Sequence, residues 1–265
     1  MKSGSDESES EPDSPVLLPR YQGFPGLMQG GYLAGLAAGD EPGPTRVQIR
    51  KPIRPGDSIV RVVDGDKRTV TLGQSIAMVA FPDELRVTDP EPLDSTTVDQ
   101  AMAAPLPWPK PFPDCAGCGD RADGLGASIK PFGKRMIATW TPGADLAVGG
   151  QHATDRLVGH ESVWTVVDCF TSWALFVDPP ADASGSFVTG NIALELRRPL
   201  LTGVDYVMQS WRERDVEPGE LGQGRFKLGS VIVGGSIEDA DGIVALADQE
   251  LVRTSGFGMN LNPPE

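Results

Sequence analysis

Two apolar stretches of helical length stand out in the hydrophobic pattern of the chain. Gly26–Gly39 carries no charged residue, and Gly159–Val177 carries no Lys or Arg. Helices with so little polar surface are normally enclosed by other elements. After each stretch, short runs alternate apolar and polar residues between Gly and Asp turns, as antiparallel strands do. The pattern predicts two copies of a buried helix followed by strands.

A phrase of ten residues supports this reading because it also occurs twice. The segment "VQIRKPIRPG" at Val47–Gly56 returns 147 residues later as "LELRRPLLTG" at Leu194–Gly203. Each copy follows one apolar helix and precedes strand-like alternation. We therefore expect an internal duplication of one structural unit. The identical pairs in the ungapped alignment are Arg50/Arg197, Pro52/Pro199 and Gly56/Gly203.

Composition divides the chain around a proline-rich segment. Eight prolines fall between Phe81 and Cys115, and most of these positions are incompatible with a helix or a central strand. An extended path across the surface is expected for such a linker. The predicted division is a disordered acidic tail at 1–19, a truncated first unit at 20–88, a linker at 89–114, a complete second unit at 115–255 and a tail at 256–265.

Charge and composition exclude several classes of protein. The net charge of −14 argues against nucleic acid as a partner. No run reaches the roughly 18 apolar residues of a membrane span, and the polar N-terminus lacks the apolar stretch of a signal peptide. Three cysteines do not make a disulfide framework and fit a reducing compartment. We expect a cytoplasmic protein without a membrane span.

The helix and strand motifs together resemble a known fold. The first helix opens with Gln29-Gly30-Gly31, and the repeated phrases "RKPIRPGD" and "RRPLLTGVD" end in a Pro corner before a turn. In these features the chain resembles double-hotdog proteins of the acyl-CoA thioesterase superfamily over roughly 20–255. The resemblance implies an α+β fold with two hotdog units. Each unit would be a buried helix wrapped by a curved antiparallel β-sheet, and the two would pack edge to edge as an intrachain pseudo-dimer.

Polar residues on the second helix supply candidate chemistry. Glu161, Thr165, Asp168 and Ser172 recur at spacings of four, three and four, so they form one stripe on an apolar cylinder. A thioester hydrolase needs a carboxylate that attacks the carbonyl or activates water. In an apolar environment Asp168 would need either a partner or a raised pKa. The alternative is a partly exposed helix face on which Asp168 meets water.

The resemblance further implies that one site combines both units. A carboxylate is expected eight residues after the helix-opening glycine, but Gly30 leads to Ala38, and Asp168 leads back to His160. The surviving halves are complementary across the pseudo-twofold axis. Gly30 would polarise the thioester and Asp168 would act as nucleophile or general base. Glycines around Gly30 would alternatively serve only tight packing. The remaining assignments are Ser172 as a catalytic residue that positions water, and Gln29, Gly31, Thr165 and His160 as substrate-binding residues.

Three functions stay open at this point. The first is a thioesterase-like hydrolase that acts on an acyl-CoA or related carrier thioester. The second is a non-catalytic protein that binds acyl groups or acyl-CoA. The third is a hydratase or dehydratase, which would require His152 or His160 beside an acid. No cofactor is expected, and assembly into a homodimer stays open.

The cysteines give a weaker signal. Cys115 and Cys118 have the spacing of a zinc knuckle, but no second Cys pair or His pair follows. Cys169 lies in the middle of the second helix and is predicted to be a core residue. We therefore expect a turn with two ordinary thiols and no bound metal.

Overall fold

The computed structural model describes most of the chain. The ranges are 13–40, 42–87, 90, 93–107, 110, 112–150, 156–179, 185–213, 225–234, 243–254 and 259–260. His152, most of the acidic tail and most of the C-terminal tail lie outside these residues. In the described part, no helix is both long and apolar enough to cross a membrane.

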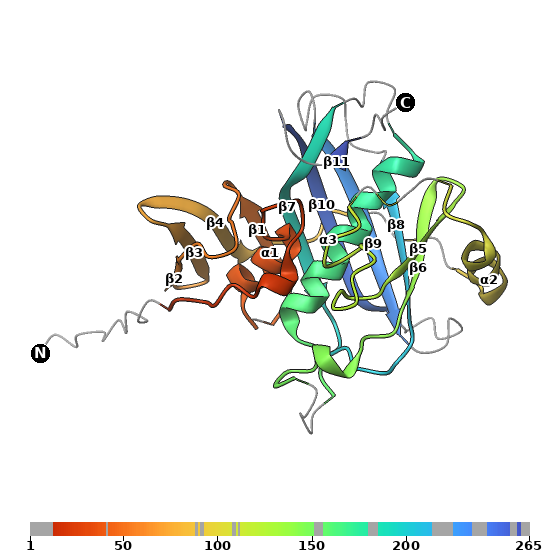
Figure 1. Cartoon of the computed structure of the whole chain (residues 1–265), viewed down its shortest axis with the longest axis horizontal. Helices are drawn as coiled ribbons and strands as arrows, with labels where there is room; N and C mark the ends of the chain where they lie inside the picture. Colours follow the sequence, from red (N-terminus) through yellow and green to blue (C-terminus); the bar gives the residue numbers. More distant parts are fainter. Residues whose placement is uncertain are drawn as a thin grey trace, which may run out of the picture.

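Two helices pack against each other on one face of the sheet (Figure 1). They are α1 at Gly30–Ala38 and α3 at His160–Val177, which correspond to the two predicted apolar stretches. The side chain of Gln29 caps α1 by accepting a hydrogen bond from Tyr32 N at 2.6 Å. A third helix, α2, spans Ser95–Ala103, and short 3-10 helices span Pro19–Tyr21 (η1) and Ala144–Leu146 (η2).

The strands form one antiparallel sheet in the order β2-β3-β4-β1-β7-β10-β9-β8-β6-β5, with β11 beside β7. The fold is therefore α+β, as the sequence predicts. The bounds are β1 Thr45–Ile49, β2 Ile59–Asp64, β3 Lys67–Leu72, β4 Ser75–Pro82, β5 Ser128–Phe132, β6 Arg135–Trp140, β7 Ser186–Leu196, β8 Tyr206–Arg212, β9 Arg225–Gly234, β10 Ile243–Thr254 and β11 Met259–Asn260.

The early and late strands meet edge to edge at β1 and β7. These strands run antiparallel, with Thr45 opposite Leu194 and Val47 opposite Ile192. Each belongs to one copy of the repeated phrase or runs directly into it. The pairing gives both strands a hydrogen-bonded neighbour on each side and so leaves neither as an open sheet edge. We refer to this β1/β7 contact as the seam.

The two copies of the phrase make matching backbone hydrogen bonds. Arg50 N donates to Ala77 O, and Arg197 N donates to Val244 O, both at 2.8 Å. In the same way, the segment before each helix donates a backbone hydrogen bond to the corner after the Pro. Met28 N contacts Ile53 O at 2.9 Å, and Val158 N contacts Leu200 O at 2.8 Å.

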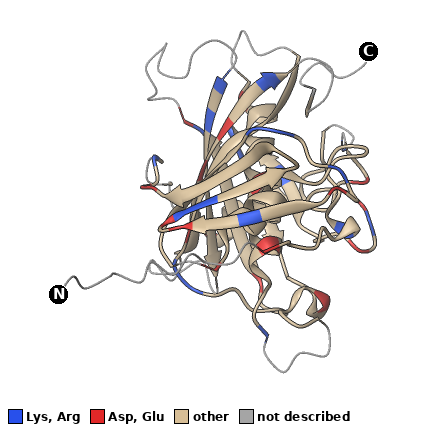
Figure 2. Ribbon diagram, turned by 90° about the vertical axis from the view of Figure 1, so that its left-hand side faces the viewer, with Lys and Arg blue, Asp and Glu red and all other residues tan. Residues whose placement is uncertain are grey.

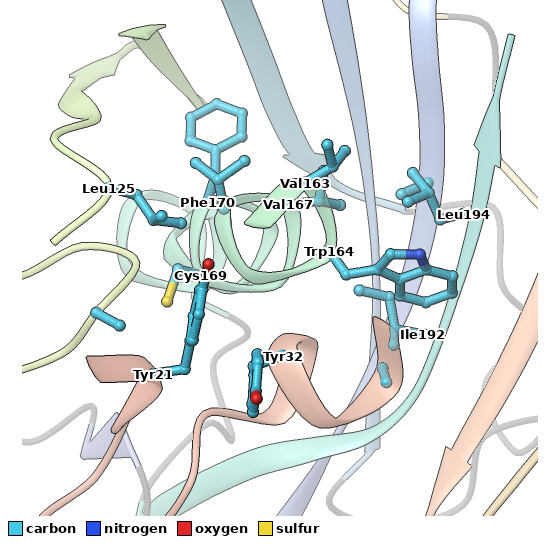
Figure 3. Close-up of a cluster of buried hydrophobic side chains, with 14 of the residues drawn as sticks. Tyr21, Tyr32, Leu125, Val163, Trp164, Val167, Cys169, Phe170, Ile192 and Leu194 are labelled. Carbon is cyan, nitrogen blue, oxygen red and sulfur yellow. The ribbon is translucent and has the colours of Figure 1, made fainter. Parts of the chain in front are cut away.

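The core lies between the helices and the sheet. Tyr21 and Tyr32 stack with ring centroids 4.2 Å apart, and α3 contributes Trp164 and Phe170 (Figure 3). The helices approach so closely at Gly31 that a Cβ there would overlap the backbone of Trp164. Glycine is thus required at this position for α1 and α3 to reach their observed separation.

The linker differs from its predicted extended path, because it contains α2. The sequence between Ser95 and Ala103 has no proline, and Asp94 caps the helix by accepting from Thr97 N at 2.6 Å. Val98 and Ala101 are buried against Ile137, whose neighbours on β6 face the opposite side of the sheet. The prolines therefore flank a helix that covers part of the outer sheet face.

A buried ion-pair network crosses the seam. Arg46 on β1 binds both carboxylate oxygens of Asp248 on β10, at 2.6 and 2.8 Å, and also contacts Asp83 and Asn191. This bidentate pair spans β7, since Arg46 and Asp248 both lie opposite Ala193, and it helps to hold β1 and β10 in register. Elsewhere basic and acidic positions are interspersed along the ribbon (Figure 2).

Candidate active site

A cavity of about 290 Å³ lies at the start of α1, beside the middle of α3. Its wall is mostly apolar and is built by the loop before α1, by both helices and by strands β7 and β10. Such a cavity with a few convergent polar groups is typical of small-molecule sites. The apolar wall includes Leu27, Leu33, Phe112, Trp173, Phe187 and Leu251.

Asp168 is the buried carboxylate on this wall, and four hydrogen-bond donors converge on it. Its Oδ2 accepts from Gln29 Nε2 at 2.5 Å and from Gly31 N at 3.0 Å. Its Oδ1 accepts from Thr189 Oγ1 at 2.6 Å and from Gln249 Nε2 at 2.5 Å. One oxygen therefore faces α1, and the other faces strands β7 and β10. The alternative in which Asp168 lies on a partly exposed helix face is wrong, because Asp168 is only 5% exposed.

The surroundings bring Asp168 into the range useful for proton transfer. Burial raises the pKa of Asp168 from 3.8 to about 6, and the hydrogen bonds from Thr189 and Gly31 oppose that rise. The carboxylate is thus mostly ionised near neutral pH and is still basic enough to take a proton. Raised carboxylates of this kind concentrate at functional sites.

The opening of α1 places backbone donors at the same position. Gly30 lines the cavity, and a Cβ on it would lie 3.3 Å from Asp168 Oδ2. The Gly31 N–H already binds Asp168, whereas the Gly30 N–H makes no hydrogen bond to the described residues. The positive end of the α1 dipole adds to this electrostatic environment. The side chain of Gln29 connects α1 with α3, since its Oε1 caps α1 and its Nε2 donates to Asp168.

Sequence analysis missed two residues of this cluster, Thr189 and Gln249. Gln249 is fully buried, and its Nε2 lies 2.8 Å from Thr189 Oγ1. On β10 it occupies a core-facing position between Ala247 and Leu251, so strict alternation along the strand was an available signal. Gly190 is the unpaired residue at the register shift between β7 and β10, and this irregularity follows Thr189 directly.

The other predicted residues are not all at the cavity. Ser172 lines it, with its hydroxyl 2.9 Å from Gln249 Nε2. Thr165 is buried beside it, but its hydroxyl donates to Glu161 O within α3. His160 lies two turns away, where its Nε2 accepts from Trp164 Nε1 at 2.6 Å. It lines a second hollow together with Glu161, so the structure does not bring it to Asp168.

The three cysteines, which the sequence analysis treats separately, lie together. Cys169 is a core residue as expected, but its Sγ lies 3.4 Å from Cys115 Sγ. All three sulfurs, including that of Cys118, lie within 4.8 Å of one another and border the cavity. The sequence could not show this, because the helix and the Cys-x-x-Cys turn are about fifty residues apart. The predicted absence of a metal rested on a count of two ligands.

Comparisons with known proteins agree with this architecture. The sequence matches no family model and no curated protein. Among solved structures, acyl-CoA thioesterase II TesB2 from Mycobacterium marinum is similar with a TM-score of 0.58 and 13% identity, over 95% of this chain and 97% of that chain. The tesB protein from Mycobacterium avium subspecies paratuberculosis gives 0.54 and 13%, over 91% and 92%. These similarities show the fold, and they confirm the predicted resemblance to hotdog thioesterases at that level.

Proposed function

We propose that the protein is a thioesterase-like hydrolase that acts on an acyl-CoA or related carrier thioester at the cavity beside Asp168. The observation that carries the proposal is the buried carboxylate held by donors from both sides of the seam. Gln29 and Gly31 come from the first half of the chain, and Thr189 and Gln249 come from the second. In this reading the cavity is the composite cleft of two hotdog units that arose by duplication and pack as a pseudo-dimer.

Asp168 then acts as the general base. With its two oxygens fixed by neighbouring donors, it takes a proton from a water molecule in the cavity, and that water attacks the thioester carbonyl. Gln249 and Ser172 lie next to Asp168 Oδ1 and orient this water. The Gly30 N–H at the start of α1 stabilises the oxyanion that forms. When the oxyanion collapses, the C–S bond breaks, and the carrier leaves as a thiol with the proton that Asp168 took from the water.

The cavity suits both ends of such a substrate. Leu33, Phe187 and Leu251 offer an apolar surface to an acyl chain. Arg50 and Lys51 line the same cavity and are exposed, which places cations where the phosphates of a carrier would enter. We expect the protein to work in the cytoplasm, where its three free cysteines stay reduced.

One observation favours a second candidate, a non-catalytic acyl- or acyl-CoA-binding protein. Both oxygens of Asp168 are already occupied by strong donors, including the Gly31 N–H that a carbonyl oxygen could otherwise use. A carboxylate so fully satisfied also suits a purely structural role. The hydratase alternative has less support, since no histidine is among the described residues that line the cavity.

The decisive experiment compares Asp168→Asn with Asp178→Asn. Both changes remove a carboxylate from the same stretch of chain, but Asp178 caps α3 outside the cavity and pairs with Arg212. We expect Asp168→Asn to lower thiol release from a panel of acyl-CoAs by about 100-fold or more, the usual contribution of a general base. The control should stay within about two-fold of wild type.

Two outcomes would contradict this assignment. Full hydrolysis by folded Asp168→Asn would remove Asp168 as the base. No hydrolysis by wild type, with acyl-CoA binding that both variants retain, would establish the binding-protein alternative. Circular dichroism and thermal unfolding check that each variant is folded.

A further inference from the structure

The three cysteines form a buried cluster in which the sulfurs lie close together. Cys115 and Cys118 come from the turn after the linker, and Cys169 comes from the middle of α3. All three are buried, and their Sγ atoms lie within 4.8 Å of one another. Figure 3 places Cys169 among buried side chains that include Tyr21 and Leu125.

The turn is shaped to approach α3 closely. At Gly117 a Cβ would overlap Cys169 Sγ and would lie 3.1 Å from Thr165 O. The turn is closed by Gly119 N, which donates to Cys115 O at 2.9 Å. Only glycine at 117 therefore lets the two thiols of the turn reach the third thiol on the helix.

Hydrogen-bond donors lie around two of the sulfurs. The backbone N–H groups of Gly117 and Cys118 donate to Cys115 Sγ, and the Trp173 side chain hydrogen-bonds to Cys118. Thiolates buried together repel each other unless a cation lies between them.

The distances fit one particular kind of cation. Three sulfurs that each lie about 2.3 Å from a tetrahedral Zn²⁺ are about 3.8 Å apart. The observed separations, from 3.4 Å for Cys115 and Cys169 up to the limit of 4.8 Å, bracket this value. Soft thiolate ligands select zinc over magnesium, calcium or manganese.

We propose that Cys115, Cys118 and Cys169 bind one Zn²⁺ with three protein ligands and a fourth position open to the cavity. All three cysteines line the cavity, so the fourth ligand is a water molecule or a group of the bound molecule. On binding, each coordinated thiol loses its proton to solvent as the Zn–S bond forms. Gln29 Nε2 lies 3.3 Å from Cys169 Sγ and 2.5 Å from Asp168 Oδ2, so one amide separates the metal site from the carboxylate.

The ion would also attach the linker to α3. It would join a turn that follows the linker to the helix that carries Asp168, and so hold one wall of the cavity in place. This inference does not rest on hydrolysis, since zinc binding is measured without any substrate.

The test measures zinc in the full-length protein under reducing conditions. We expect about one zinc per chain by elemental analysis, and a thiolate-to-metal charge-transfer band when Co²⁺ replaces it. Cys115→Ser, Cys118→Ser and Cys169→Ser should each weaken Zn²⁺ binding by more than about 100-fold, since loss of an outer-shell partner alone costs 10- to 100-fold. Asp168→Asn keeps all three thiols and should bind Zn²⁺ as wild type does.

Wild-type protein supplies a readout that survives poor folding of the variants. Zn²⁺ should protect all three cysteines from alkylation, as seen by mass spectrometry of their peptides. Equal alkylation with and without Zn²⁺ would overturn the proposal. So would full binding by Cys169→Ser, or copper(I) bound in place of zinc under reductant. The two proposals can fail independently. A variant can lose zinc and still hydrolyse acyl-CoA, and another can lose hydrolysis and still bind zinc.

Discussion

The helices α1 and α3 meet at two places, and at each the start of one helix lies beside the middle of the other. We call them the first crossing, at the start of α1, and the second crossing, at the start of α3. The two differ in their polar side chains. Matching hydrogen bonds align Met28 with Val158 and Ile53 with Leu200. On this alignment Ala38 takes the place of Asp168. At the start of α1 a glycine meets a carboxylate, whereas at the start of α3 the corresponding positions hold a histidine and an alanine.

The strands differ in the same way. Gln249 lies opposite Ile192 on β7, and Pro82 lies opposite Thr45 on β1. Proline has no side-chain donor, so Pro82 cannot supply the hydrogen bond that Gln249 gives to the carboxylate at the first crossing. Its hollow is lined instead by Tyr21, Tyr32 and other residues of the N-terminal segment. One scaffold thus presents two crossings and completes the set of polar groups at only one.

Placing a carboxylate at the second crossing tests this comparison most severely. Ala38 is buried on α1, and among the described residues no counterpart of Thr189 or Gln249 is positioned there. Ala38→Asp should therefore lower the free energy of unfolding by about 3–5 kcal/mol, the cost of an uncompensated buried charge. Chemical denaturation measures this loss. A stable variant with doubled hydrolysis would show that the second crossing needs only the acid.

Removing one hydrogen-bond donor from the first crossing should lower catalysis without removing the carboxylate. Gln249→Ala leaves Asp168 Oδ1 with Thr189 alone and removes the group next to Ser172. We expect kcat to fall by about 10- to 100-fold, as a hydrogen bond to a charged group contributes about 1.5–3 kcal/mol.

Gln209→Ala is the matched control for this change. Gln209 is another buried glutamine of the same sheet, on β8, and it accepts from Arg135 rather than from a residue of the cavity. Its loss should reduce stability and leave kcat within about two-fold. Equal losses of kcat in both variants would mean that Gln249 acts only through packing.

The pH dependence of hydrolysis should follow Asp168 at the first crossing and not His160 at the second, and this effect is smaller than those above. Hydrolysis should rise about ten-fold between pH 5 and 7, since Asp168 ionises with a pKa of about 6. At the other crossing, burial lowers the pKa of His160, which is the second ionisable group that this test must separate from Asp168. Profiles of kcat/KM for wild type and His160→Asn should coincide. A profile shifted by the histidine change would contradict the assignment to Asp168.

The same pKa fixes the sign of a stability effect. Asp168 binds its proton more tightly in the folded state than in the unfolded state, where the pKa is near 3.8. Its contribution to stability is therefore greatest below pH 3.8 and declines as the pH rises to about 6. Asp168→Asn should lack this decline in denaturation experiments across that window.

Periodicity and repetition predicted the elements of the fold well. The apolar stretches gave α1 and α3, and the repeated phrase gave β1, β7 and their corners. These features are local, so the sequence carries them directly. The linker helix α2 was not predicted, because the prolines on both sides of it indicated an extended chain. Asp94 was an available signal for the start of a helix.

Predicting the site was harder because its partners are distant in sequence. Asp168 could be proposed from its place in the second apolar stretch, and Gln29 from the resemblance to hotdog proteins. Gln29 Nε2 lies 2.5 Å from Asp168 Oδ2. Thr189 and Gln249 reach the carboxylate only through strand register and a bulge, which alternation alone does not place. The meeting of Cys169 with Cys115 depends on how the turn crosses α3, and nothing local reports it.

The two halves of the site are joined covalently, so dilution of the protein does not separate them. Two separate chains that shared a site would come apart as their concentration fell, because each encounter is bimolecular. Here β1 and β7 belong to one chain, and the connection holds one half near the other at a constant effective concentration. Gln29 and Asp168 therefore stay together at any protein concentration, and the site needs no second molecule to supply either of them.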